Sequence, residues 1–333
     1  MKVAFDGSVL LGRFATGVER SFLHTLAALR AAQPQHELVV LFPGTATAAL
    51  PSGVVGRALG GGQLAWRERR LAAVLRGERF DLLHAPVAAL PLWRSCPAVA
   101  TVHELPWREP DATRADWRLA DRLRVRLLPR LADVVLTPSQ HTATRLAQEL
   151  PGLGARIRVA PHAVDPRFFA VRGGAGDYLL VVAAARPRKN LPFLLRAVAR
   201  ARELAPAVPP LRVVGPPAHY VADADLPAVV AGARALLLPS RSEGFGLPLL
   251  EAMAAGVPVL ASDRGALPEI AGGAALHASA TDAAAFAQAI VRIATDTALR
   301  QQLVAAGAAR AREFTAARAV AGWCAAWAAA VGS

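Results

Sequence analysis

The chain has 333 residues, 54% of them apolar and 6% aromatic, which suits a globular protein large enough for two domains. Its formal net charge of +13 comes mainly from arginine, and its two cysteines match neither a disulfide framework nor a paired metal-ligand spacing. The first residues predict a strand rather than a signal peptide, because no long apolar region follows the lysine. No segment approaches the ~18 apolar residues of a spanning helix. Composition therefore argues against a secreted or transmembrane protein, and we expect a cytoplasmic location.

The first half of the chain alternates short β-branched strands with helical stretches, the pattern of a parallel sheet covered by helices. A glycine-bounded loop at 12–17 precedes a helix over 18–32, and a longer helix is expected over 112–132. Ser139 is expected to cap the next helix. The expected strands are Lys2–Phe5, Leu38–Phe42, Leu82–His84, Val99–His103 and Val134–Thr137.

A second series begins after the glycine-rich segment 173–176, which we interpret as the linker between domains. Its expected strands are Tyr178–Ala183, Leu211–Val214, Ala235–Leu238 and Val257–Ala261. Its expected helices are Leu191–Glu203, Pro248–Ala255, Asp282–Thr295, Ala298–Glu313 and Ala316–Ala330. The sequence thus predicts two doubly wound, Rossmann-like α/β domains over 1–172 and 173–312, with the helix in 313–333 packing back on the first. Ligands of such sheets bind at the carboxyl ends of the strands.

The most informative segment is 239–269, where Glu243 and Glu251 are separated by seven residues that include the turn Gly-Phe-Gly-Leu-Pro. The glycines let the main chain turn tightly and approach a ligand, and Pro248 suits the first position of a helix. Amides at the start of that helix would point at an anion, aided by the helix dipole. These amides are those of Gly246, Leu247 and Leu249. With Glu243 in the turn and Glu251 in the first helical turn, the arrangement fits a nucleotide sugar.

This segment resembles the donor site of retaining glycosyltransferases of the GT-B fold, family 4, whose signature is two glutamates separated by seven residues. The alternative is a loop and an amphipathic helix, in which Glu251 only favours the helix N-terminus. The resemblance implies that Glu243 is catalytic and nearest the sugar, and that Glu251 holds the ribose hydroxyls. It also implies donor contacts from Gly244, Phe245, Gly246 and Leu247.

The segment Arg188-Lys189-Asn190 follows an expected strand and resembles the family's phosphate clamp. The resemblance implies that Lys189 neutralises the donor pyrophosphate and stabilises the leaving nucleoside diphosphate. The alternative, a solvated helix start, would leave cations beside a helix N-terminus that repels them. The family often has an arginine where this chain has Ala184, and Arg186 or Arg188 is expected to replace it.

His103 ends an apolar strand and, with Glu104, resembles the family's His-Asp pair. In relatives such a histidine contacts the transferred sugar, so the resemblance implies that His103 is catalytic. The alternative is a structural histidine on an apolar strand.

Two weaker resemblances lie elsewhere. The loop 12–20 is similar to the family's glycine-rich loop, which implies a donor contact at Gly17. The segment 159–165 matches the family's Asn-Gly-Val-Asp hinge, with His162 and Ala163 as substitutions, and we expect a structural role for it.

One interval departs from the family. Relatives have a helix, a strand and a base-reading loop where this chain has only nine residues, Pro216 to Ala224. A parallel crossover needs about a dozen residues, so we expect a shortened C-terminal domain. Base recognition would be simplified or supplied by 216–220, where Tyr220 is either a stacking residue or an exposed loop aromatic.

We therefore interpret the chain as a GT-B enzyme with two domains facing a cleft. The expected reaction moves a hexosyl unit, with mannose favoured, from a nucleoside-diphosphate sugar to a hydroxyl of a glycan or lipid-linked acceptor, with anomeric retention. The overall resemblance is to bacterial mannosyltransferases of surface polysaccharide synthesis. The Asp-x-Asp at 223–225 precedes a predicted helix rather than ending a strand, so we expect no metal and no cofactor. The base, sugar, acceptor, oligomeric state and choice between covalent and front-face mechanisms stay open.

Three other functions are alternatives to this interpretation. The first is another GT-B activity, that of a phosphorylase or a sugar-nucleotide epimerase. A phosphorylase would need a lysine for pyridoxal phosphate, and this chain has very few lysines. A basic nucleic-acid-binding protein would need aromatics interleaved with cations on a sheet face or in a groove, whereas the basic residues here lie on predicted helices. A degenerate scaffold is disfavoured by the intact Glu243, Lys189 and Glu251.

The arginine-rich stretches 64–80 and 107–130, with Trp66, Trp107 and Trp117, have three interpretations: a solvated helical face, an anionic membrane surface or a nucleic-acid patch. Arginine and tryptophan favour a membrane interface, whereas interspersed acids favour the solvated face. We expect no nucleic-acid partner, and a peripheral position on the inner face of the cytoplasmic membrane is the alternative to a purely cytoplasmic one.

Overall fold

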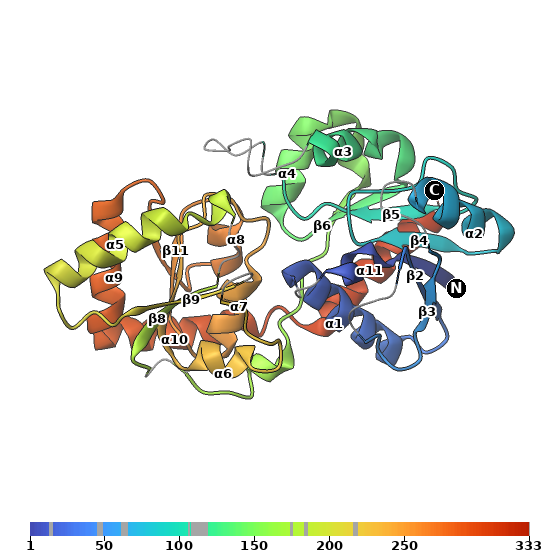
Figure 1. Cartoon of the computed structure of the whole chain (residues 1–333). Coiled ribbons are helices and arrows are strands. Elements are labelled where there is room, and N and C mark those ends of the chain that lie inside the picture. The colour runs from blue at the N-terminus through green and yellow to red at the C-terminus, as the bar shows by residue number, and fades with distance from the viewer. Residues whose placement is uncertain are drawn as a thin grey trace. The chain divides into compact units, whose positions relative to one another are not determined.

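The computed structural model describes residues 1–12, 16–44, 49–60, 66–105, 107, 119–173, 176–182, 186–215 and 219–332. The chain forms two compact units, each built on a parallel sheet (Figure 1). Unit 1 comprises Met1–His103, Arg118–Ala163 and Ala316–Ser333, and unit 2 comprises Glu104–Trp117 and Val164–Thr315. The two doubly wound domains expected from the sequence are thus what the chain forms.

The boundary between the units falls after Ala163, whereas the sequence placed it at 172/173. The reason is that residues just after the hinge already belong to the second core. Phe168 is fully buried in that core, and the Val164 amide donates to the Phe314 carbonyl (3.0 Å).

Unit 1 contains a seven-stranded sheet in the order β3-β2-β1-β4-β5-β6-β7, with every neighbouring pair parallel. The strands are β1 Lys2–Asp6, β2 Glu37–Phe42, β3 Val55–Ala58, β4 Leu82–Ala85, β5 Ala98–Thr101, β6 Val134–Thr137 and β7 Ile157–Val159. The central strands are buried on both faces, as their apolar runs predicted. The short edge strands β3 and β7, whose residues are mostly exposed, were not predicted from the sequence.

The helices of unit 1 are α1 Gly17–Ala32, α2 Ala72–Gly77, α3 Leu119–Leu131, α4 Gln140–Glu149 and α11 Ala316–Val331, with a π-helical turn, Arg67–Leu71, before α2. Thr16 and Glu19 form a capping box at the start of α1. The Ser139 hydroxyl accepts the Thr142 amide (3.1 Å), which confirms it as the cap of α4. The last helix, α11, packs on α1 and the sheet and buries Trp327 in the core of unit 1.

Unit 2 contains a five-stranded parallel sheet in the order β12-β11-β10-β8-β9. The strands are β8 Tyr178–Val182, β9 Leu211–Val214, β10 Ala233–Leu238, β11 Val259–Ser262 and β12 Leu276–Ala278. The helices are α5 Leu191–Leu204, α6 Leu226–Ala231, α7 Leu247–Ala254, α8 Leu267–Ala271, α9 Ala283–Thr295 and α10 Thr297–Ala311. Helices α5 and α9 share one apolar core, while α6, α7 and α8 share another. Figure 1 shows α5 and α9 on one side of this sheet and α7 and α8 on the other.

The shortened second domain is visible at β9, the edge strand of this sheet. After Val214 the next regular element is α6, and the described residues between them, 215 and 219–225, form only a bridge between Gly215 and His219 and a turn. This part of the chain therefore lacks the extra helix and strand expected in relatives.

Among the described helices, none is long and apolar enough to cross a bilayer alone, and α10 with α11 passes that test only as a bent pair.

Candidate functional site

The candidate site of unit 2 lies where its strands end. The loops after β8, β10 and β11 leave the same edge of the sheet, because parallel strands end together. The loop after β8 enters the 3-10 turn Pro187–Lys189, and the loop after β10 leads to α7. Two hydrogen bonds tie these segments together. The Arg241 amide donates to the Arg188 carbonyl (2.8 Å), and the Ser262 hydroxyl donates to the Ser240 carbonyl (2.6 Å).

Glu243 is the centre of this site and is 7% exposed. Its Oε1 accepts the Lys189 ammonium (2.5 Å) and the Ser240 hydroxyl (2.7 Å). Its Oε2 lies 3.5 Å from Nη1 of Arg188. The structure thus brings together the expected catalytic carboxylate and two of the expected phosphate-binding cations.

The charge of Glu243 is decided by these cations. Burial by itself raises the pKa of a carboxyl, but the charges of Lys189 and Arg188 and the bonds from Lys189 and Ser240 outweigh it. Together they lower the pKa of Glu243 to about 2. The side chain is therefore an anion at any physiological pH.

Arg188 has two further partners besides Glu243. Its Nη1 donates to the Ser242 carbonyl (3.1 Å), and its Nη2 pairs with Glu104 (3.0 Å). Arg186, in contrast, is exposed at the start of the turn, and Ala184 lies outside the described residues. Of the two candidates to replace the family's arginine, Arg188 is the one held against the carboxylate.

Helix α7 starts at Leu247, with Gly246 as its left-handed N-cap at φ 102°. A Cβ on Gly246 would lie 2.8 Å from Leu267, so this turn needs glycine both for its backbone angle and for space. The Leu249 amide donates to the Gly246 carbonyl (3.0 Å). The expectation that this amide faces an anion is therefore wrong, because the first turn of the helix already uses it.

Two further expectations about α7 need correction. Glu251 lies in the second turn of the helix rather than the first, because the helix begins one residue before Pro248. It is 3% exposed. The Phe245 side chain is also buried, edge-on to Phe314 with ring centroids 5.7 Å apart, so its ring belongs to the core. A donor contact from Phe245 would have to come from its backbone, as it would from the neighbouring Gly244.

The contacts of two residues that shape the site were not predicted from the sequence, although Asn190 was named as part of the phosphate clamp. Asn190 has a left-handed backbone, φ 58°, and its Nδ2 donates to the carbonyls of Pro239 (3.2 Å) and Ala280 (3.0 Å). Gly265 lies so close that a Cβ would be 2.5 Å from the Glu243 carbonyl oxygen. The only sequence signals were a polar residue before a helix and a glycine in a turn, neither of which points to these contacts.

In unit 1, His103 lies beyond the end of β5 rather than within it, because the strand stops at Thr101. Its Nε2 donates to the Pro86 carbonyl (2.9 Å). Burial lowers the pKa of His103, although the bond to Pro86 opposes that effect. The ring is stacked on His162, with centroids 5.3 Å apart and planes 28° apart.

Gly17 is the first residue of α1 and not part of the loop, because the capping box starts the helix there. Residues 13–15 of the expected loop lie outside the described residues. Across the described ranges, no group of three or more His, Cys, Asp or Glu side chains could hold a metal ion.

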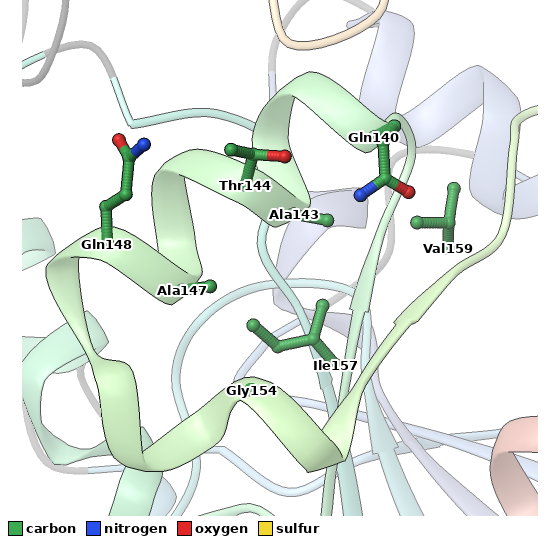
Figure 2. A pocket seen from close by; sticks show the side chains of 8 residues that line it. All are labelled: Gln140, Ala143, Thr144, Ala147, Gln148, Gly154, Ile157 and Val159. Atoms are coloured by element: carbon green, nitrogen blue, oxygen red, sulfur yellow. The ribbon is translucent and has the colours of Figure 1, made fainter.

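A groove of about 440 Å³ lies along the edge of the first sheet, beside α4, β7 and the 3-10 turn Pro151–Arg156 (Figure 2). None of its lining residues is ionisable or belongs to the candidate site. They are Gln140, Ala143, Thr144, Ala147, Gln148, Gly154, Ile157 and Val159.

Comparison with known proteins places both units in one family. Residues 15–168 match the model of "Glycosyltransferase Family 4", and residues 176–296 match that of "Glycosyl transferases group 1". Over 96 residues the chain is 45% identical to "O-antigen chain mannosyltransferase B" of Escherichia coli, covering 29% of this chain and 25% of the relative. Over 242 residues it is 33% identical to "MMP alpha-(1->4)-mannosyltransferase" of Mycolicibacterium hassiacum, covering 61% of this chain and 59% of the relative. The chain thus spans less than two thirds of these curated relatives.

Solved structures share the fold over nearly the whole chain. Sucrose-phosphate synthase of Thermosynechococcus elongatus matches with a TM-score of 0.74 at 18% identity, covering 98% of this chain and 96% of that one. HepE of Anabaena, solved with UDP-glucose, matches with a TM-score of 0.74 at 16% identity, covering 98% and 99%. The GT-B fold expected from the sequence is confirmed by these neighbours and by the two parallel-sheet units. The chain therefore belongs to the GT-B glycosyltransferases described by the family 4 and group 1 models.

Proposed function

We propose that this protein is a retaining glycosyltransferase that moves a hexosyl unit from a nucleoside-diphosphate sugar to a hydroxyl of a glycan or lipid-linked acceptor. The observation that carries the proposal is the buried, anionic Glu243 held by Lys189 and Arg188 at the strand ends of unit 2. A carboxylate beside two cations is the combination that a sugar joined to a diphosphate requires. Mannose is the favoured sugar, because both curated relatives named above are mannosyltransferases.

In the proposed reaction, the bond between the anomeric carbon and the diphosphate oxygen breaks, the acceptor hydroxyl oxygen forms a new bond to that carbon, and the proton of the hydroxyl passes to the leaving diphosphate. Lys189 and Arg188 take up the negative charge that grows on the leaving diphosphate. Glu243 orients the sugar hydroxyls and balances the positive charge that develops on the ring. Because Lys189 pairs with Glu243, we expect the lysine to be shared between the carboxylate and the pyrophosphate of a bound donor.

Glu251 and the amides of Gly246 and Leu247 complete the proposed donor site of unit 2, with Glu251 on the ribose hydroxyls. In unit 1, we propose a donor contact at Gly17 and a contact of His103 with the transferred sugar. The cations of the strand-end loops would stabilise the negative charge of the diphosphate. We therefore propose a reaction independent of metal ions and of any cofactor.

A donor panel tests this function. Purified protein is incubated with GDP- and UDP-linked mannose, glucose and N-acetylglucosamine, and release of the nucleoside diphosphate is measured against a Glu243→Gln control. We expect release from one donor, with GDP-mannose the first candidate, and a loss of at least about a hundredfold in the control. Binding of a diphosphate without turnover of any donor, even with added glycan or polyprenyl-linked acceptors, would overturn the proposal.

A second proposal concerns access to a lipid-linked acceptor: we propose that helix α3 docks reversibly on an anionic membrane surface. Leu119, Leu123 and Leu127 are 52%, 51% and 38% exposed and recur at every fourth residue. That spacing places them on one side of the helix. Exposed cations such as Arg126 and Arg130 lie on the same helix, and cations beside an apolar stripe suit anionic headgroups. Such docking would give the enzyme, for which we propose a cytoplasmic location, a peripheral position on the inner membrane face.

The tryptophans available for this surface differ from those expected. Trp66 is 2% exposed and packed in the core, which removes it, and Trp117 lies outside the described residues. Trp93 was not expected, yet it is 73% exposed. The pair between Arg94 and Asp133 (2.7 Å) holds its segment beside the end of α3.

Liposome flotation tests the docking. We expect binding to anionic vesicles that falls with salt, since the attraction acts within about a Debye length, ~8 Å at physiological ionic strength. Leu123→Ser should weaken it, whereas Leu195→Ser, which changes an equally exposed leucine on α5 (51%), should not. Equal partition onto neutral and anionic vesicles, or none onto either, would contradict the proposal.

A further inference from the structure

Three side chains from separate elements meet at the strand ends of unit 1, and two of them have no part in the function proposed above. His162 follows β7, Ser21 lies on α1, and His103 follows β5. The Ser21 Oγ and His162 Nδ1 are 2.7 Å apart, within hydrogen-bond distance. The imidazole ring of His162 is in turn stacked on that of His103, with ring centroids 5.3 Å apart.

His103 is held from further sides. Its Nε2 donates to the Pro86 carbonyl, and its own carbonyl accepts the Thr142 hydroxyl (3.4 Å). Because a neutral imidazole has one donor and one acceptor nitrogen, the bond to Pro86 leaves Nδ1 as the acceptor. A ring in this tautomer can accept a hydrogen bond from a sugar hydroxyl.

Burial favours the neutral form of both rings. Burial, and to a smaller extent the charge of His103, lower the pKa of His162 to about 3. A third histidine, His84, also interacts with His103, and burial lowers the pKa of His84 to about 3 as well. Protonation of one ring would place a cation against a neighbouring imidazole in a site with little water.

We infer that His162, oriented by Ser21, is a positioning residue for His103. It covers one face of the His103 ring and fixes the plane in which Nδ1 is presented to a hydroxyl of the sugar. This inference rests on the proposed function, because it needs His103 to contact the substrate. The sequence predicted a structural role for the hinge that contains His162, a position at which the resembling family has asparagine.

The test compares His162→Ala, which removes the stacked ring, with His162→Phe, which keeps an aromatic ring of similar shape. We expect kcat of His162→Ala to fall about 10- to 100-fold with a change in donor KM below about threefold, because misplacing a reacting group costs rate more than binding. His162→Phe should restore most of that loss. Ser21→Ala should cause a smaller loss, about three- to tenfold, because the stack remains while the ring of His162 gains freedom.

A double variant separates positioning from general damage. If His162 acts through His103, then His103→Ala with His162→Ala should be no slower than His103→Ala alone. His36→Ala is the control, since His36 belongs to the same unit and its Nδ1 lies 3.2 Å from the amino terminus instead of near His103. Its activity should equal that of the wild type.

An independent measurement is the ¹⁵N shift pattern of His103 at pH 7, which reports the tautomer without any assay. We expect the Nε2–H tautomer in the wild type and in His162→Phe, and a mixture in His162→Ala. This readout also serves if an alanine variant proves too unstable to assay.

The outcomes are distinguishable. Loss of activity in His103→Ala but wild-type kcat and tautomer in His162→Ala would overturn the positioning role and leave the proposed function standing. Full activity in His103→Ala would overturn both the role of His103 and this inference. Additive losses in the double variant would mean that His162 acts independently of His103, and the inference would again be wrong.

Discussion

Among the buried ionisable side chains near the strand ends, one in unit 2 is charged and two in unit 1 are neutral. In unit 2 Glu243 is buried and stays charged, with a pKa of about 2, whereas in unit 1 His84 and His162 stay neutral, with pKa values of about 3. Burial disfavours the charged form in all three. Glu243 has ionised partners in contact, Lys189 at 2.5 Å and Arg188 at 3.5 Å.

The comparison teaches that burial alone does not set the charge of a site. The sheet edge of unit 2 supplies cations that outweigh the desolvation of a carboxylate. The edge of unit 1 supplies neutral partners such as Ser21 and the Pro86 carbonyl, which suit an uncharged imidazole. One edge is thus suited to a charged diphosphate and the other to hydroxyl groups.

The largest effect is expected from Glu243→Gln, which removes the anion but keeps the shape of the side chain. Transfer should fall at least about a hundredfold while the fold persists, since electrostatic contributions of several kcal/mol are typical at reacting centres. Initial rates with the preferred donor measure the loss, and circular dichroism checks the fold. Unchanged turnover would remove Glu243 from the mechanism.

Lys189→Ala removes the ammonium group that pairs with Glu243 in the same site. It should weaken binding of the donor and of the free nucleoside diphosphate together, by about tenfold or more, because both carry the pyrophosphate. Calorimetric titration measures both affinities. Arg196→Ala, which removes an exposed cation on α5, is the matched control and should change neither. An intact diphosphate affinity in Lys189→Ala would contradict the clamp.

The neutral histidines of unit 1 predict how its stability depends on pH. The Trp327 indole donates to Nδ1 of His84 (3.1 Å), so this nitrogen must be unprotonated in the folded state. Because burial lowers the folded pKa of His84 from 6.5 to about 3, the unfolded chain binds the extra proton between these values. Stability should therefore fall as pH drops below about 6.5, by up to about 1.4 kcal/mol per pH unit for this group.

Urea unfolding at pH 7 and pH 5 measures that slope. His84→Gln keeps an acceptor for Trp327 but does not titrate, so its slope should be shallower by the same amount. Glu243 changes stability in the same direction but in a lower pH window, because its folded pKa is lowered from 4.5 to about 2. Its stabilisation is present above pH 4.5 and is lost only as the pH falls toward 2. Equal slopes in the wild type and His84→Gln would contradict the neutral, buried state of His84.

The smallest effect is expected from chelation. If the cations of unit 2 carry the charge of the diphosphate, activity should stay within about twofold in excess EDTA. The same rate assay measures this. Inhibition by EDTA that a divalent ion reverses would show that Lys189 and Arg188 are not sufficient.

The local pattern of the sequence was enough to predict most of the fold. Strands such as Leu211–Val214 and Val134–Thr137 were predicted to the residue, because short runs rich in apolar and β-branched residues, bounded by turn residues, mark strands. The cap at Ser139 was predictable because a cap depends only on neighbouring residues. The edge strands β3, β7 and β12 were not, since three or four half-exposed residues carry little periodicity.

The sequence by itself determined that Glu243, Lys189 and His103 follow strands and so lie at strand ends. The tertiary structure alone decided which groups surround them. Lys189 is 54 residues from Glu243 along the chain, Ser21 is 141 from His162, and Trp327 is 243 from His84. Such contacts leave no periodic trace in the sequence, because they depend on how whole strands and helices are placed. The charge of a side chain depends on those contacts, and it is therefore a property of the fold.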